Sequence, residues 1–153
     1  MTDDIKKRLD VVLVAGGKYH DIDFARLELL KLLAEDDRIR TRVYEDYSNL
    51  HAISNADFLI TYTCDVRPTL EEQKVLKDFV ANGKRWLALH GTNSILQFLS
   101  DGRVDCPRVA PIFMETLGSQ FLSHPPIEPY TVTVADGDHH LVEGVEPFET
   151  NDE

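Results

Sequence analysis

The sequence has little of what defines several protein classes. It contains two cysteines, Cys64 and Cys106, which form neither a CxxC pair nor a zinc-finger spacing. No apolar stretch is long enough to cross a membrane. The formal net charge of −11, from 27 acidic and 16 basic residues, disfavours nucleic acid and anionic membranes as partners. The first residues lack a secretory signal pattern, so we expect a cytoplasmic protein.

Nucleotide-binding motifs are missing as well. Gly16 and Gly17 follow the first apolar run, but their spacing is neither GxGxxG nor that of a P-loop. The same position lacks the acidic pair that holds Mg²⁺ in a phospho-receiver domain. We therefore expect no nucleotide cofactor.

What the sequence does contain is an alternation of short apolar segments and amphipathic ones. Its 153 residues fit one domain and suffice to bury a core without disulfides or metals. The predicted strands lie at 11–15, 41–44, 58–62 and 85–89, and the predicted helices at 22–35, at 49–54 and after Pro68. This alternation predicts an α/β fold, with a mostly parallel sheet flanked by helices on both faces.

Capping patterns indicate where some helices begin. Thr69 and Glu72 match a capping box. Ser94 and Gln97 have the same spacing, which predicts a further helix directly after His90. Beyond residue 99 the pattern weakens, and the expected elements are a loop at 102–111, a short helix at 113–117, a strand at 130–135 and a turn at 136–138.

The most informative stretch is residues 86–94, which predicts a buried strand, a tight turn and a helix start. His90 stands at the turn. In α/β-hydrolases the analogous turn presents a nucleophile. An imidazole at this place can act as a base, a hydrogen-bond donor or a metal ligand. The positive end of the predicted helix would favour a neutral His90.

Other polar residues should join His90, because ligands in open parallel sheets bind outside the carboxyl ends of the strands. The segments 16–21, 63–68 and 90–94 each follow a predicted strand and should share that edge. The residues that we expect to act in catalysis are His90, His20, Asp21, His124 and Asp65. Those that we expect to bind substrate are Gly17, Cys64, Arg67, Gly91, Thr92 and Asn93.

Most of these residues also have a purely structural interpretation. Asp21 could be a helix cap with His20 as its neighbour, and Cys64 could be an inert buried thiol. Asp65 and Arg67 could form a local ion pair. Residues 92–94 could cap a helix, and the pair at 16–17 could be a tight turn.

Metal binding stays open at this stage. His124 precedes two prolines, which could aim it into the site or simply bridge to the next strand. His20, His90 and His124 could hold a divalent metal such as zinc, with an aspartate as oxygen ligand. No two histidines have the HxxxH or HExxH spacing.

Five segments together carry a family resemblance: 16–21 (GGKYHD), 61–65 (TYTCD), 86–94 (WLALHGTNS), 117–126 (LGSQFLSHPP) and 138–139 (DH). In these segments the chain resembles the ThuA-like (trehalose utilisation) family of the class I glutamine amidotransferase-like, flavodoxin-related superfamily. The resemblance implies a three-layer flavodoxin-like fold for a single domain over residues 1–153. Glutamine amidotransferases carry a cysteine nucleophile where His90 stands, so we expect no glutaminase activity.

The family pattern continues with further strands beyond the point where this sequence stops. A missing terminal strand would leave an exposed sheet edge, and such an edge could pair with a second copy of the chain. We therefore expect that the chain could form a homo-oligomer through this edge.

For function, the resemblance implies a role in the metabolism of trehalose or related disaccharides and keto-sugars, with a small-molecule carbohydrate as partner. One hypothesis is an enzyme, a hydrolase, lyase or isomerase, that uses histidine acid/base or metal-assisted chemistry. The alternative is a non-catalytic module that binds a carbohydrate or another partner. A third hypothesis is a cysteine hydrolase that uses Cys64.

Overall fold

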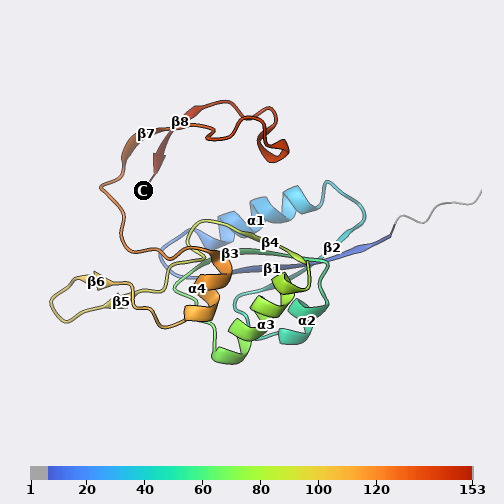
Figure 1. The fold of residues 1–153 in the computed structure, drawn as a ribbon, viewed down its shortest axis with the longest axis horizontal. Helices are drawn as coiled ribbons and strands as arrows, with labels where there is room; N and C mark the ends of the chain where they lie inside the picture. The colour runs from blue at the N-terminus through green and yellow to red at the C-terminus, as the bar shows by residue number, and fades with distance from the viewer. Residues whose placement is uncertain (1–6, 153) are drawn as a thin grey trace, which may run out of the picture. The chain divides into compact units, whose positions relative to one another are not determined.

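A four-stranded parallel sheet organises the larger part of the chain. The computed structural model describes residues 7–152, which form two compact units that divide between Leu122 and Ser123. The strands of the sheet are β1 (Leu9–Gly17), β2 (Ile39–Tyr44), β3 (Phe58–Cys64) and β4 (Arg85–Ala88). Their order, β2-β1-β3-β4, is the order of a flavodoxin-like sheet (Figure 1). The predicted α/β fold with a mostly parallel sheet is confirmed.

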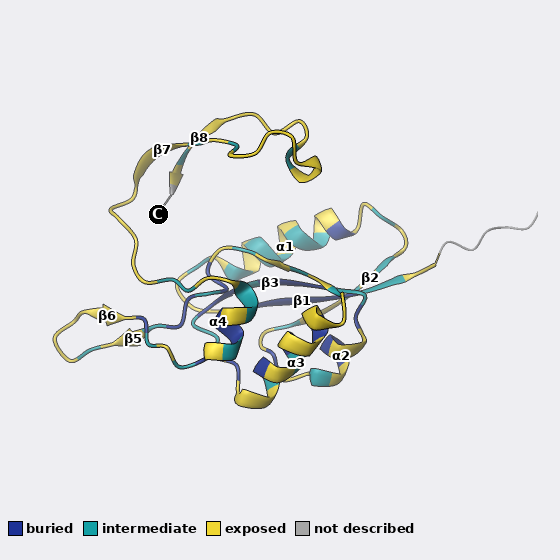
Figure 2. Cartoon of the chain, in the orientation of Figure 1, coloured by how far each residue is buried: buried dark blue, intermediate teal, exposed yellow. Residues whose placement is uncertain are grey.

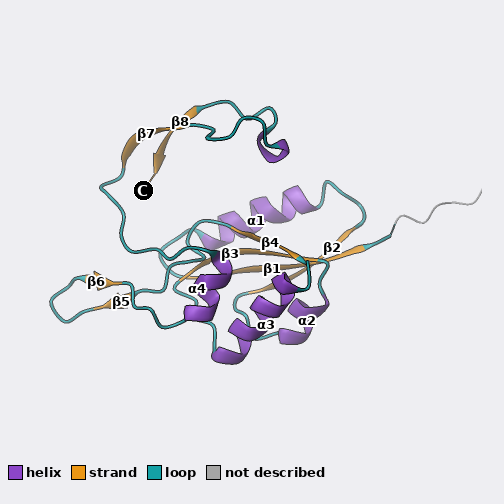
Figure 3. Cartoon of the chain, viewed as in Figure 1, coloured by secondary structure: helices purple, strands orange, loops and turns teal. Residues whose placement is uncertain are grey.

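Helices cover both faces of this sheet and make three layers. Helix α1 (Ile22–Leu33) lies on one face. Helices α2 (Leu50–Asn55), α3 (Leu70–Ala81) and α4 (Pro111–Leu117) pack on the other face (Figures 1 and 3). The layering follows from the crossover connections, because each parallel strand must be reached from the far end of the previous one.

The two central strands form the core (Figure 2). Val12 and Val14 of β1 face the α2–α3–α4 layer, whereas Val11 and Leu13 face α1. All four side chains are buried. Full burial of a valine or leucine contributes about 1.5–3 kcal/mol to folding. The ends of β1 and β3 are therefore held by buried strands at the centre of the sheet.

Local capping sets where two helices begin, as the sequence predicts. The Thr69 hydroxyl accepts a hydrogen bond from the Glu72 N–H at 3.3 Å, and the Glu72 carboxylate accepts one from the Thr69 N–H at 2.7 Å. The predicted capping box of α3 is thus confirmed. Asp21 caps α1 by accepting a hydrogen bond from the Phe24 N–H at 2.9 Å.

The helix predicted after His90 is wrong. Residues 90–93 form turns, and the chain continues into β5 (Gln97–Phe98), which pairs antiparallel with β6 (Val104–Asp105). The Ser94 carbonyl accepts a hydrogen bond from the Asp65 N–H at 2.9 Å, and the Asp65 carboxylate accepts one from the Leu96 N–H at 3.0 Å. These bonds attach residues 94–96 to Asp65, directly after the end of β3. Because residues 90–93 form turns and not a helix start, no helix dipole at this turn favours the neutral form of His90.

Residues beyond 99 follow the prediction only in part. The loop expected at 102–111 contains β6 and the first residue of α4. The second unit holds an antiparallel hairpin of β7 (Glu128–Val132) and β8 (Phe148–Asp152), with a 3₁₀ turn, η1 (His140–Val142), between them. The expectation of one domain over residues 1–153 stays a prediction. Within residues 7–152, none of the helices has the length and apolarity needed to cross a bilayer.

Strand β4 forms one edge of the sheet, and β2 forms the other. The β4 side chains are mostly exposed, including Leu87, which keeps 52% of its surface exposed. This edge is where a further parallel strand would add to the order β2-β1-β3-β4. Self-association through the edge stays a prediction, which we take up in the Discussion.

Candidate functional site

The three loops that follow β1, β3 and β4 meet at the carboxyl edge of the sheet. The Lys18 N–H donates a hydrogen bond to the Cys64 carbonyl at 3.0 Å, and this bond joins the first loop to the end of β3. The bond from Asp65 to Ser94 joins the end of β3 to the third loop. The segments 16–21, 63–68 and 90–94 thus lie together, as the topology of the predicted sheet requires.

At the centre of this edge, two imidazole rings are in contact. The ring centroids of His20 and His90 lie 5.1 Å apart, and the ring planes meet at 64°, an edge-to-face arrangement. The Tyr62 ring lies 6.0 Å from that of His20. His90 is exposed and His20 is half-buried. A neutral imidazole has one ring nitrogen that accepts a proton and one that donates, so the pair can accept and donate protons.

Gly91 makes room for this contact. Its φ is +85°, in the left-handed region that glycine adopts most readily. A Cβ atom on Gly91 would lie 2.7 Å from the Thr63 carbonyl oxygen and 3.1 Å from His20 Nε2. Any larger residue would therefore strain the turn and press on the His20 ring.

A buried network of hydroxyls anchors the same turn to β3. Thr92 is 3% exposed, and its hydroxyl lies 3.0 Å from the Thr61 hydroxyl and 3.2 Å from the Thr61 carbonyl oxygen. The Trp86 indole N–H donates to the Thr61 hydroxyl at 3.0 Å. All three contacts are satisfied together when Thr92 donates to the carbonyl and Thr61 donates to Thr92. Thr92 thus positions the turn that carries His90.

The two aspartates predicted for catalysis are engaged in structural contacts. Asp21 holds the N-terminus of α1, in agreement with its structural interpretation. Asp65, at a φ of +58°, binds the Lys18 ammonium at 2.9 Å and the Leu96 N–H at 3.0 Å. The hydrogen bond that the Lys18 ammonium donates to the Asp65 carboxylate raises the pKa of Lys18. The cation that pairs with Asp65 is thus Lys18, and Arg67 is exposed.

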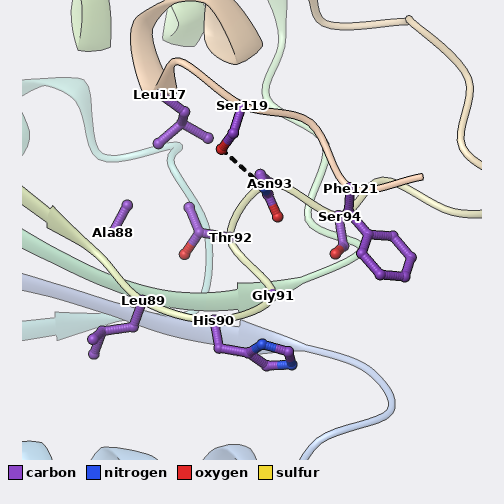
Figure 4. Close-up of a pocket in the computed structure, with 10 residues that line it drawn as sticks. All are labelled: Ala88, Leu89, His90, Gly91, Thr92, Asn93, Ser94, Leu117, Ser119 and Phe121. Atoms are coloured by element: carbon purple, nitrogen blue, oxygen red, sulfur yellow. Dashed lines mark hydrogen bonds between the residues drawn. The ribbon is translucent and has the colours of Figure 1, made fainter. Parts of the chain in front are cut away.

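A hollow of about 280 Å³ opens beside the turn (Figure 4). Residues 88–94 line one side, and Leu117, Ser119 and Phe121 line the other. Asn93 reaches across and donates a hydrogen bond from its side-chain amide to the Ser119 hydroxyl at 2.9 Å. The hollow thus has an amide and hydroxyls on its walls, groups that can exchange hydrogen bonds with a polar ligand, while the His90 side chain points away from Asn93 and Ser119 (Figure 4).

A second hollow of about 370 Å³ borders His20 from the side of β1 and β2. Arg26 and Glu45 line it, together with Gly17 and Asp21. The Arg26 guanidinium donates to the carbonyl of Ala15 at 2.8 Å. Its Nε is buried and has no hydrogen-bond partner among the described residues.

The remaining predicted residues occupy varied positions. Gly17 lies where β1 and β3 approach closely, since a Cβ there would lie 1.9 Å from the Cys64 carbonyl oxygen. Cys64 is 3% exposed, which agrees with the inert-thiol interpretation and disfavours a nucleophile. His124 belongs to the second unit, where its Nδ1 lies 2.8 Å from the Pro125 carbonyl oxygen. Its convergence with His20 and His90 stays a prediction.

No group of three or more His, Cys, Asp or Glu side chains among residues 7–152 is placed to hold a metal ion. Sequence reasoning did not select Arg26, Glu45, Ser119 or Phe121, which line the two hollows. Ser119 and Phe121 fall inside the segment 117–126 that carries the family resemblance, and that resemblance could have indicated them as site residues. Nothing in the local sequence marks Arg26 or Glu45.

Comparison with solved structures identifies the fold. The three-layer chain has a ThuA-like fold: it matches the crystal structure of a protein from Bacteroides uniformis, described provisionally as ThuA-like, with a TM-score of 0.70. The two sequences are 17% identical, and the match covers 95% of this chain and 59% of that chain. This chain thus spans less than two thirds of the other protein's length. No protein-family model matches, and no curated protein matches the sequence.

Proposed function

We propose that this chain is a ThuA-like protein of carbohydrate metabolism, and that its His20–His90 pair transfers protons on a disaccharide or keto-sugar. The observation that carries the proposal is the edge-to-face contact of the two imidazoles at 5.1 Å. The pair lies at the carboxyl edge of a parallel sheet, where such folds bind their ligands. The fold match supports the ThuA-like assignment.

In this proposal His90 is the general base or acid, because it is exposed at the rim of the polar hollow. His20, half-buried against Gly91 and Tyr62, orients His90 and exchanges a proton with it. Asn93 and Ser119 would receive the hydroxyl groups of the sugar.

The test is turnover of trehalose and of keto-trehalose, followed by mass spectrometry and NMR, with and without added zinc. We expect His90→Ala to lower turnover by about a hundred- to ten-thousandfold, the usual contribution of a general acid or base. His51→Ala is the matched control, because His51 is an exposed histidine on α2. Retention of full activity in His90→Ala would remove His90 from the mechanism.

A second function, a non-catalytic carbohydrate-binding module, is favoured by a separate observation. Asp21 and Asp65, the two carboxylates predicted to act with the histidine pair, are committed to a helix cap and to an ion pair. A proton-transfer site without a free carboxylate must depend on the imidazoles alone. Binding of disaccharides in calorimetry with no product, in the presence and absence of zinc, would favour the module.

A further inference from the structure

Two exposed aromatic rings contact one another beside the histidine pair. Tyr19 precedes His20 in the first loop, and Phe98 belongs to β5. Their ring centroids lie 5.7 Å apart with the planes tilted at 47°. Each side chain keeps 58% of its surface exposed. Val104, which pairs with Phe98 across β5 and β6, is exposed as well and extends the apolar patch.

The rings are held in place by contacts beneath them. Tyr19 has a φ of +69°, a conformation that non-glycine residues avoid because Cβ crowds the backbone. Lys18, the preceding residue, is tied to Asp65 by its ammonium and to Cys64 by its N–H. Asp65 also binds the Leu96 N–H, two residues before Phe98. One carboxylate therefore fixes both loops that carry the rings.

The chemistry of such a surface suits the face of a sugar ring. A pyranose presents C–H groups on a face and hydroxyl groups around its edge. Aromatic rings carry negative charge on their faces, which attracts polarised C–H groups, and they bury area with little loss of side-chain entropy. Lys18 and His20, the two sequence neighbours of Tyr19, carry polar groups that could bind the hydroxyl edge.

We infer that Tyr19 and Phe98 form a subsite that stacks one pyranose ring of a disaccharide next to the His20–His90 pair. This inference rests on the proposed function, since it names how the same site takes its carbohydrate. In this inference the two rings bind one sugar unit of the disaccharide, and the other sugar unit then lies within reach of the imidazoles. A single exposed aromatic residue on a surface is ordinary, whereas contiguous exposed apolar side chains rimmed by polar groups are typical of binding sites.

The experiment is an NMR titration of the whole chain with trehalose, maltose and glucose, observed at the aromatic signals of Tyr19 and Phe98. Tyr19→Leu and Phe98→Leu keep an apolar side chain and remove the ring. We expect each to raise the dissociation constant about five- to tenfold, from the usual strength of one aromatic contact. Tyr19→Phe, which keeps the ring, should restore binding to within about twofold of the wild type.

Leu32→Ala is the control for loss of exposed apolar surface, because Leu32 lies at the far end of α1 and is 57% exposed. It should leave the titration unchanged. Amide spectra of all variants check that they are folded. The absence of shifts in the Tyr19 and Phe98 signals with every sugar, up to its solubility, would overturn the inference.

The two proposals fail in distinguishable ways. If the ring signals shift and the leucine variants weaken binding while no sugar is turned over, the subsite stands and the catalytic role of His90 is lost. If His90→Ala abolishes turnover while the leucine variants keep the wild-type KM, the catalytic proposal stands and the subsite is refuted. A rise in KM with unchanged kcat in the leucine variants supports both.

Discussion

The hydroxyl groups of Thr61 and Thr92 lie 3.0 Å apart in the interior, and this contact fixes the turn that presents His90. Thr61 belongs to β3, which is buried at the centre of the sheet, whereas Thr92 belongs to a turn at its edge. The position of His90 therefore depends on the core through a polar contact. Because hydrogen bonds are directional, this anchor limits the turn to a narrow range of geometries.

Thr92→Val keeps the shape of the side chain and removes its hydroxyl. We expect a loss of about 1–2 kcal/mol in the free energy of unfolding, because the buried Thr61 carbonyl loses a donor. Urea unfolding measures the loss. Thr131→Val, at an exposed threonine of β7, is the control. Equal stability of the two variants would mean that the hydroxyl contact does not anchor the turn.

Gly91→Ala tests the space between the turn and His20. The positive φ and the approach to Thr63 both oppose a Cβ atom, so we expect a loss of more than about 1 kcal/mol. Gly83→Ala separates the two causes, since Gly83 has a φ of +78° but no atom within 4 Å of the added Cβ. The His20 ring signals should move in the Gly91 variant alone. An unmoved His20 would refute the proposed contact.

The buried phenol of Tyr47 should lower the free energy of unfolding at alkaline pH. Burial raises the pKa of its phenol above the ordinary value of 10.0, while its hydroxyl lies 3.0 Å from that of Thr63. The unfolded chain releases this proton at lower pH than the folded chain. The contribution is thus complete below pH 10 and falls, as pH rises further, by at most about 1.4 kcal/mol per pH unit.

Tyr47→Phe removes this proton and should flatten the fall in stability above pH 10, at the cost of about 1 kcal/mol at neutral pH from the lost hydrogen bond. Tyr130→Phe, at an exposed tyrosine of β7, should keep the slope of the wild type. Thermal unfolding from pH 8 to pH 11 measures both. A slope unchanged by Tyr47→Phe would contradict the assignment.

We expect copies of the chain to associate through the edge strand β4. Its outer backbone groups are not paired within the described sheet, and Leu87 is exposed beside them. Leu87→Lys places a charge on this edge, and edge charges discourage strand pairing. Sedimentation should show a concentration-dependent dimer that the variant weakens. Val43→Lys, on the opposite edge strand β2, should have no effect, and a monomeric wild type would contradict the prediction.

Much of the fold could be predicted because its signals are local. The apolar run at 11–15 marks a strand buried on both faces, and the capping box of Thr69 and Glu72 needs four consecutive residues only. The same local rule failed at Ser94 and Gln97. There, hydrogen bonds to Asp65, far away in the sequence, replaced the expected helical bonds. A capping pattern spans only a few residues, so it contains no information about hydrogen bonds to a residue as distant in sequence as Asp65.

The sequence by itself determined the parallel sheet, the edge at which three polar loops meet and the place of His90 in one of them. Only the tertiary structure decided that His20 contacts His90, that Asp65 binds Lys18, and that Tyr19 meets Phe98. The physical reason is the range of the interactions. Strands and caps follow from neighbours a few residues apart, whereas side-chain partners at a sheet edge depend on how separate loops pack.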